Sequence, residues 1–126
     1  MTISPSDTIT RHHVGARLSE IAVFNGTVYL AGQIPENHPD ADMGVQATEV
    51  FGHVERLLTE AGSSKAHILM CQIFIRDAGD MEAMNAVWDA WIPAGHTPPR
   101  ATVIAPAINP AYRLEVIVTA AQIQKA

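Results

Sequence analysis

The sequence predicts an α+β fold in which a mixed sheet carries two helices on one face. Three observations support this class. Two β-rich runs surround Asn25-Gly26, two later segments space their apolar residues as helices do, and each of these segments is followed by further apolar strands. The expected order is therefore β-β-α-β-α-β-β, a split βαβ pattern. At 126 residues, the chain is expected to form one domain, residues 1–126.

The first half of the chain is predicted to form a hairpin, a loop and a helix. In EIAVFNGTVYLAG, the dipeptide Asn25-Gly26 is a strong signal for a two-residue hairpin turn. The stretch QIPENHPDADMG is rich in Pro, Asp and Asn, which predicts a loop. A helix is expected from about Gly44 to Ala61, and Gly62 is well suited to end it.

The second half is predicted to form a strand, a second helix and two more strands. In the strand HILMCQIFIRD, the alternating set that begins at Leu69 is wholly apolar and the opposite set is nearly so. Asp80 is expected to be a simple N-cap of the second helix, which Pro93 and Gly95 close. The expected apolar face of this helix comprises Met81, Met84, Val87, Trp88 and Trp91. The segments RATVIAPA and YRLEVIVTAAQI read as the last strands, separated by the turn-rich INPA.

This arrangement predicts self-association. Two helices can cover only one face of the sheet, yet the strand over residues 67–76 is apolar on both faces, and Ile104 and Ile117 are expected to add to the uncovered side. A monomer would expose that face as a large apolar patch. An oligomer of closed symmetry is the favoured solution. Termini that fold back over the face are the alternative.

Composition narrows the function classes. The net charge of −5 disfavours a nucleic-acid partner, which would require a basic face. No apolar run approaches the roughly 20 residues that span a bilayer, and the stretch MTISPSDTITRHHVG does not read as a signal peptide. We therefore expect a cytoplasmic protein with no membrane partner.

The motifs for metals and phosphates are absent, so neither a metal nor a cofactor is expected. The sequence His53-Val-Glu55 matches the H-x-E of zinc deaminases, but these also need P-C-x-x-C, and Cys71 is the one cysteine. Cys71 lies within an apolar strand and reads as a small buried hydrophobe rather than a nucleophile. No glycine-rich phosphate loop occurs.

Arg100 and Glu115 are the candidate chemical groups. Period-two alternation places Arg100, Thr102 and Ile104 on one face of their strand, and the small apolar set Ala101, Val103 and Ala105 is expected to face the helices. Arg100 and Glu115 are then both expected on the helix-free face. A guanidinium held behind two prolines can bind a carboxylate through two hydrogen bonds, the backbone at Gly32 can approach a ligand, and Glu115 can hold a water. A structural ion pair at an interface is the alternative.

Four motifs in order carry a family resemblance: AGQIPEN, EAMNAVWDAW, PPRATV and YRLEVIVTAA. Together they resemble the RidA family, also called YjgF/UK114, over residues 17–121. The fifteen-residue spacing from Arg100 to Glu115 also matches the family. The residues around AMNAVWDAW and NPAY resemble the YoaB-like branch of the family more than its central RidA branch.

The resemblance implies a chorismate-mutase-like fold, assembled as a homotrimer with clefts between subunits, in which the last strand inserts between the second and third expected strands. It also implies hydrolysis of reactive 2-imino acids or enamines to 2-keto acids and ammonia without a cofactor. In this family, the residue at the position of Arg100 binds the substrate carboxylate. The residue at the position of Glu115 acts on the water that reacts with the substrate. The position of Gly32 offers a backbone contact, and that of Asn85 lies near the cleft.

Three site positions depart from the deaminase pattern. The deaminase branch usually has tyrosine, serine and cysteine where this chain has Leu18, Ala31 and Thr102. These three residues are still expected to line the substrate site. The sequence thus predicts an imine deaminase acting on a small 2-imino acid. The alternatives are a non-catalytic protein that binds a small carboxylate or 2-keto acid in the same cleft, and a ribonuclease, which the acidic charge disfavours.

Overall fold

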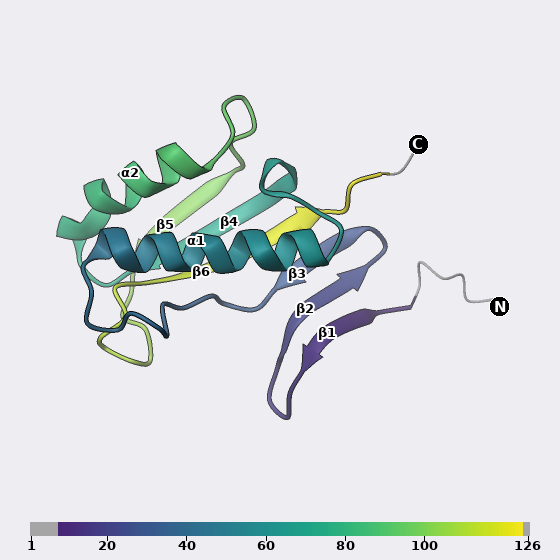
Figure 1. Cartoon of the computed structure of the whole chain (residues 1–126), viewed down its shortest axis with the longest axis horizontal. Coiled ribbons are helices and arrows are strands. Elements are labelled where there is room, and N and C mark those ends of the chain that lie inside the picture. The colour runs from purple at the N-terminus through teal and green to yellow at the C-terminus, as the bar shows by residue number, and fades with distance from the viewer. Residues whose placement is uncertain (1–7, 125–126) are drawn as a thin grey trace.

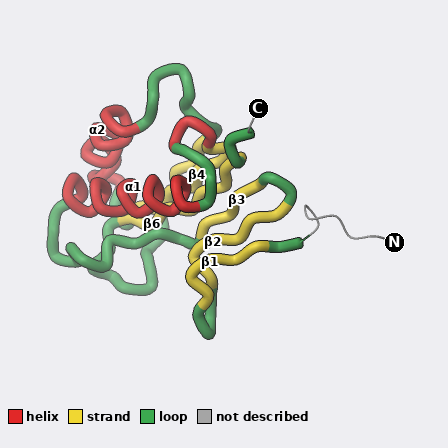
Figure 2. Tube along the Cα trace, turned by 45° about the vertical axis from the view of Figure 1, so that its right-hand side comes forward, coloured by secondary structure: helices red, strands yellow, loops and turns green. Residues whose placement is uncertain are grey.

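A computed structural model describes residues 8–124 and contains one six-stranded mixed sheet with two α-helices on one face (Figures 1 and 2). The predicted class is confirmed. The start of the segment Met1–Gly15, excluded above as a signal peptide, lies outside the described residues. Neither helix in the described part is long and apolar enough to cross a membrane. The elements are β1 (Thr10–Val14), β2 (Ser19–Phe24), β3 (Thr27–Leu30), α1 (Met43–Glu60), β4 (Ile68–Ile75), α2 (Met81–Trp91), β5 (Arg100–Ile104) and β6 (Leu114–Ala121), with short 3₁₀ turns at Lys65–His67 and Ala78–Asp80.

The strand order is β1-β2-β3-β6-β4-β5, so the last strand lies between β3 and β4 as the family resemblance implies. Only β4 and β5 pair in parallel, joined by the crossover through α2. Sequence reasoning missed β1, which pairs with β2 at the edge of the sheet. Four of its five residues are exposed, so it carries no alternating apolar pattern that could have predicted it. Figure 1 shows that β1 and β2 extend beyond the helices.

Most of the turn and helix-end signals in the sequence correspond to the structure as predicted, and one does not. Asn25 and Gly26 both have positive φ, 51° and 78°, as a type I′ hairpin turn requires. Gly62 follows the end of α1 with φ 80°. Asp80, however, makes no capping hydrogen bond to α2. Its Oδ2 instead accepts a hydrogen bond from Nη1 of Arg113 at 3.0 Å, so the predicted cap is wrong.

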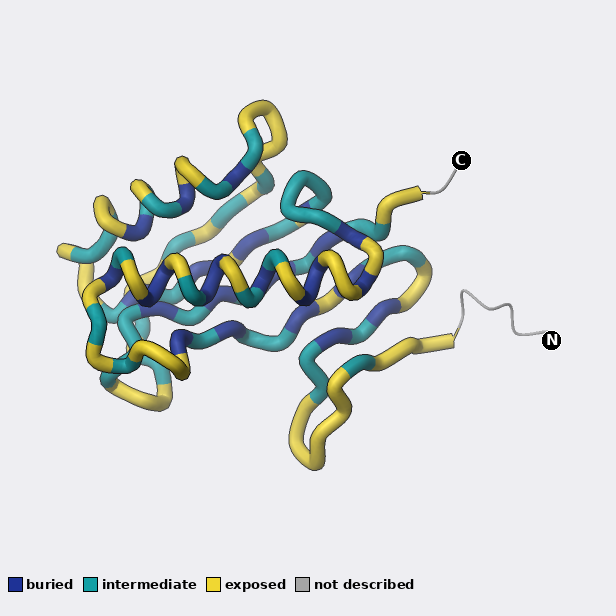
Figure 3. Tube along the Cα trace, viewed as in Figure 1, coloured by how far each residue is buried: buried dark blue, intermediate teal, exposed yellow. Residues whose placement is uncertain are grey.

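The core lies between the helices and the inward face of the sheet, and Figure 3 shows buried residues concentrated on the central strands and on the inner side of α1. The alternating residues Leu114, Val116, Val118 and Ala120 of β6 are all buried. In β4, a register shift between Ile68 and Met70 leaves Leu69 half exposed. The buried set is therefore Ile68, Cys71, Ile73 and Ile75, and the assignment of Leu69 to the core is corrected.

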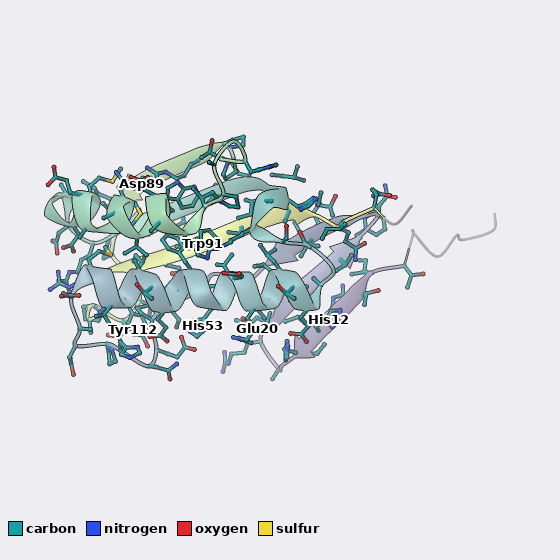
Figure 4. The ribbon with its side chains drawn as sticks, turned by 45° about the horizontal axis from the view of Figure 1, so that its top comes forward. His12, Glu20, His53, Asp89, Trp91 and Tyr112 are labelled. Atoms are coloured by element: carbon teal, nitrogen blue, oxygen red, sulfur yellow. The ribbon has the colours of Figure 1, made fainter. Side chains whose placement is uncertain are left out.

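The two helices are joined by an aromatic cluster. Trp91 reaches from α2 toward α1 (Figure 4) and stacks on Phe51 with ring centroids 4.9 Å apart. Trp88 meets the edge of the same ring at 5.7 Å. This cluster fixes α2 against α1, and thereby positions α2 above β5.

A buried glutamine fastens the long loop between β3 and α1. Gln46 is fully buried on α1, and its Nε2 lies 3.1–3.2 Å from the carbonyl oxygens of Pro39, Ala41 and Ala111. Its Oε1 accepts a hydrogen bond of 2.7 Å from the N–H of Arg113. One side chain therefore ties together α1 and the two loops that precede α1 and β6.

We expect Gln46→Leu to destabilise the fold by about 2–4 kcal/mol, because it removes the acceptor of the Arg113 N–H and the donor to the carbonyls of Pro39 and Ala111. Urea unfolding followed by circular dichroism measures the change. Gln124 is exposed, so Gln124→Leu is the matched control and should shift the free energy of unfolding by less than about 0.5 kcal/mol. Equal effects of the two variants would contradict this role of Gln46.

A carboxylate on α1 holds the same loop from outside. Glu49 accepts hydrogen bonds from the N–H and Nδ2 of Asn37 at 3.0 and 2.9 Å. Its oxygens also lie 2.7 Å from Nδ1 of His38 and 2.9 Å from Nε2 of His53. Burial raises the pKa of Glu49, but the hydrogen bonds from His38, Asn37 and His53 outweigh that effect, and the net pKa is lowered from its ordinary value of 4.5.

Because the pKa of Glu49 is lower in the folded chain than in the unfolded one, its ionised form stabilises the fold above the ordinary value of 4.5. That contribution is lost as the pH falls through the folded pKa. We therefore expect Glu49→Gln to lower the free energy of unfolding at pH 7, with the difference from wild type shrinking below pH 4.5. Urea titrations at several pH values test this.

Candidate functional site

Arg100 begins β5 and faces the helices. It pairs with Cys71, a buried residue of the helix-covered face, and paired residues in a ladder point to the same side. Its Cζ lies 5.0 Å from the ring centroid of Trp88, a cation–π distance. Among residues 8–124, Arg100 forms no ion pair. The prediction that Arg100 lies on the helix-free face is therefore wrong, and the N–H groups of its guanidinium have no carboxylate partner in the described chain.

Two polar atoms without partners lie on the elements that hold Arg100, β5 and α2. Thr102 is on the same face of β5, since it pairs with Ile73 of the core. Its Oγ1 and the Oδ1 of Asn85 on α2 are buried and have no hydrogen-bond partner within the described residues. A buried polar atom without a partner costs about 1–3 kcal/mol. Arg100, Asn85 and Thr102 therefore share one property: the polar atoms of each lack a hydrogen-bonding or ionic partner among the described residues.

Glu115 lies on the opposite face of the sheet, as predicted. It pairs with Phe74 on the side away from the helices, while its neighbour Val116 is fully buried beneath them. Its carboxylate lies directly against Gly32, and a Cβ at residue 32 would collide with Oε2 of Glu115. Glycine at this position therefore makes room for the carboxylate.

The backbone around Gly32 is irregular. Between the pairs Tyr29–Thr119 and Gln33–Val116, β3 and its extension advance one residue more than β6 does. The N–H of Ala31 bonds to β2, that of Gln33 bonds to Val116, and the N–H of Gly32 makes no hydrogen bond within residues 8–124. The free donor expected at Gly32 is thus present, next to Glu115.

The structure does not bring Arg100 and Glu115 together within one chain. Cys71 of β4 pairs with Arg100 on one side and with Val118 on the other, so Arg100 lies level with Val118. Glu115 is three residues further along and two strands across, which corresponds to about 10 Å in each direction. It also projects from the other face. The chain therefore carries two half-sites, Arg100 with Asn85 and Thr102, and Glu115 with Gly32.

Leu18 and Ala31 lie near Gly32. Leu18 is exposed at the end of the β1–β2 turn and lines, with Gly32 and with Arg56 and Leu57 of α1, a cleft of about 300 Å³ whose lining does not include Glu115. Sequence reasoning missed two polar residues here. Nε2 of the buried Gln33 donates to Oε2 of Glu20 at 2.9 Å and to the carbonyl of Ala31, also at 2.9 Å. The Gln of AGQIPEN was visible in the sequence, but its partner is thirteen residues away and no local pattern links them.

One cluster of side chains in the described chain carries ligand atoms of the types that bind metal ions. Ligand atoms of Glu36, Glu49 and His53 all lie within 4.8 Å of one another. They already bond to each other, since Nε2 of His53 lies 2.9 Å from Glu49 and 3.3 Å from Glu36. Arg56 approaches Nδ1 of His53 at 3.4 Å. Metal independence stays a prediction.

Cys71 is 1% exposed, in keeping with its predicted role as a small buried hydrophobe. Burial raises the pKa of its thiol to about 12, although Arg100 nearby acts to lower it. A thiol of this kind is a poor nucleophile at neutral pH.

The helix-free face of the sheet is uncovered in the described chain. Apolar side chains on it include Tyr29, Phe74, Val103 and Ile117, and those of Tyr29 and Val103 are about half exposed. Ile104, predicted to lie on this face, instead shares the helix side with Arg100 because it pairs with Ile75. Glu115 thus projects into an apolar surface that no helix protects.

Comparisons with known proteins agree on one family. The family model described as Endoribonuclease L-PSP matches residues 8–122. The RutC family protein YoaB of Escherichia coli K12 is 42% identical over 114 residues, which is 90% of this chain and 98% of that protein. A RutC family protein of Haemophilus influenzae is 39% identical, with 90% and 97% covered.

Solved structures agree with the sequence relatives. A YjgF family member from Neisseria meningitidis superposes with a TM-score of 0.91 at 39% identity, covering 95% of this chain and 99% of that one. A protein from Salmonella typhimurium described as a putative translation initiation inhibitor gives 0.83 at 39% identity, with 91% and 98% covered. The chain therefore belongs to the YjgF (RidA, RutC, endoribonuclease L-PSP) family, with YoaB among its relatives, as the sequence motifs predict.

Proposed function

We propose that this protein is a homotrimeric, cofactor-independent deaminase of the cytoplasm that hydrolyses reactive 2-imino acids to 2-keto acids and ammonia. One observation carries the proposal: the two half-sites lie on opposite faces of the sheet, and each lacks what the other supplies. The Arg100 half has a cation without a counter-ion, and the Glu115 half has a carboxylate beside a free N–H. In the proposed trimer, Arg100 of one subunit meets Glu115 of its neighbour across a cleft.

The uncovered face supports assembly. A monomer would keep an apolar surface that includes Tyr29, Val103 and Ile117 in water, and closed symmetric association removes it. The same association carries the Glu115 half-site of each subunit into a cleft. Assembly and completion of the site are then one event.

In the proposed mechanism, Arg100 binds the substrate carboxylate through two N–H groups, and the N–H of Gly32 from the neighbouring subunit adds a third contact. Glu115 orients a water and accepts its proton as the water oxygen attacks the imine carbon. Glu115 returns this proton to the imine nitrogen, which gives a tetrahedral adduct with a hydroxyl and an amino group on the former imine carbon. Glu115 then moves the hydroxyl proton to the amino group, the C–N bond breaks as the carbonyl forms, and ammonia leaves with Glu115 again ionised. Positioning and fixed charge are sufficient, because free imines also hydrolyse unaided.

The second candidate is a protein that binds a small 2-keto acid in the same cleft without catalysis. The proposed position of Glu115 favours the enzyme, because a carboxylate next to an anionic ligand weakens binding and is useful only if it handles a proton. Ribonuclease activity, suggested by the name of the matched family model, is disfavoured by the net charge of −5.

The direct test generates imines in situ with an amino-acid oxidase and traps them as semicarbazones. The wild-type protein should lower semicarbazone formation. Arg100→Lys keeps the charge but loses the paired N–H donors, so kcat/KM should fall about tenfold or more while the melting temperature changes little. If the wild-type protein leaves semicarbazone formation unchanged for every amino acid tried, the enzyme hypothesis is wrong.

The composite site makes a sharper prediction. Arg100→Ala and Glu115→Ala should each be inactive alone, but a 1:1 mixture unfolded and refolded together should recover about a quarter of wild-type activity. In that mixture, about one cleft in four receives Arg100 from one chain and Glu115 from the other. The two variants mixed without unfolding are the control. No recovery on refolding, with trimers confirmed by light scattering, would place both residues in the same chain's site and contradict the proposal.

A further inference from the structure

Three arginines of the described chain are half-buried, and one of them is held differently from the other two. Arg76 and Arg113 each form an ion pair with an aspartate, at 2.8 and 3.0 Å. Arg100 has no carboxylate within ion-pair distance among residues 8–124. Its Cζ lies 5.0 Å from the ring centroid of Trp88. An aromatic ring therefore stands where the other two arginines have an acidic side chain.

The other residues next to this contact supply no negative charge. Cys71, which pairs with Arg100 across β4 and β5, is buried, and burial raises the pKa of its thiol to about 12, so the thiol is neutral at pH 7. Asp89 follows Trp88 on α2, but it is exposed and forms no ion pair within the described residues. The guanidinium of Arg100 is therefore held beside an aromatic ring and a neutral thiol.

The same aromatic cluster holds a second cation in a different way. Nζ of Lys65 lies 5.6 Å from the ring centroid of Trp91 and also 3.7 Å from Oε1 of Glu55. The same oxygen accepts a hydrogen bond of 3.0 Å from Nε1 of Trp91. At this end of the cluster the cation has both an aromatic and an acidic partner. At the Arg100 end it has the aromatic partner alone.

We propose that Trp88 is a positioning residue for Arg100: its ring holds the guanidinium by a cation–π contact and leaves the paired N–H donors free for a ligand carboxylate. The inference rests on the proposed function, since it concerns the same arginine. A carboxylate partner would also fix the guanidinium, but its oxygens would occupy the N–H groups that the ligand needs. An aromatic ring attracts the cation without contributing a competing oxygen.

The ring of Trp88 is itself fixed. Trp88 is 5% exposed, and its ring lies 5.7 Å from that of Phe51 and 5.9 Å from that of Trp91. The guanidinium therefore rests against a surface that cannot follow it. Removing the ring should release Arg100 into other rotamers and weaken its hold on the carboxylate in the ground state and the transition state alike. Such a loss raises KM and leaves kcat nearly unchanged.

The first test measures the kinetics of variants with an imine generated in situ. Trp88→Leu should raise KM about tenfold and change kcat by less than about twofold. Trp88→Phe keeps an aromatic face and should raise KM by no more than about threefold. Trp91→Leu is the matched control, because it removes an indole of the same cluster that does not hold Arg100, and KM should stay within about twofold. Equal rises in KM for the two leucine variants, or a loss of kcat at unchanged KM, would reduce Trp88 to a packing role.

The second test changes the charge of the ring and keeps its shape. The chain has two tryptophans, so fluorinated tryptophan in the Trp91→Phe protein labels Trp88 alone. Fluorine withdraws charge from the face of the ring and weakens its attraction for a cation. The dissociation constant of pyruvate, measured by calorimetry, should rise with each added fluorine, by about threefold for three, while the melting temperature changes little. The same series in Trp88→Phe labels Trp91 alone and should be flat. A flat series at Trp88 would overturn the proposal.

The outcomes separate this proposal from the proposed function. If the wild-type protein binds pyruvate but hydrolyses no imine, the deaminase hypothesis fails, and the fluorine series still decides the role of Trp88. If it does neither, NMR relaxation of the Arg100 Nε–H, assigned by its absence in Arg100→Lys, decides. Its order parameter should be high in the wild type and in Trp88→Phe, and should fall below about 0.6 in Trp88→Leu. An equally high value in Trp88→Leu would contradict the positioning role.

Discussion

The pairing of β5 with β4 is the constraint on which the site depends. Arg100 lies opposite Cys71, so its side chain must project toward the helices, and the next residues on that face follow in steps of two. Shifting this register by one residue would send Arg100 to the other face, where Glu115 already lies. The pairing thus decides that the two candidate groups cannot meet within a chain. A site that uses both must be built between chains.

The same constraint connects fold, assembly and chemistry. With helices on one face only, the other face stays apolar and open, and the irregular backbone at Gly32 presents its N–H beside Glu115 on that side. On the covered side, Phe51, Trp88 and Trp91 fix α2 against α1, and Trp88 in turn holds Arg100. The aromatic contacts therefore position Arg100 within the single chain.

Local structure that has a strong sequence signal could be predicted from the sequence. The pairing between strands that are distant in the sequence could not. Asn25-Gly26, Gly62 and the alternation in β6 specify their structure within a few residues, and the structure follows them. The face of Arg100 depends on which residue of β4 it meets, some thirty positions earlier. The small apolar set Ala101, Val103 and Ala105 suggested the wrong face, because β5 is an edge strand whose exposed side tolerates Ala101 and Val103.

The departures from the deaminase pattern acquire meaning from the two half-sites. Leu18 lines a cleft with Gly32, Ala31 directly precedes that glycine, and Thr102 lies on the same face of β5 as Arg100. Leu18 and Ala31 each put an alkyl group where the deaminase branch has a hydroxyl-bearing side chain, and Thr102 puts a hydroxyl where that branch has a thiol. Under the proposed function, we expect these changes to alter which substrate side chain fits, because Arg100, Gly32 and Glu115, which would bind the carboxylate and act on the water, are retained.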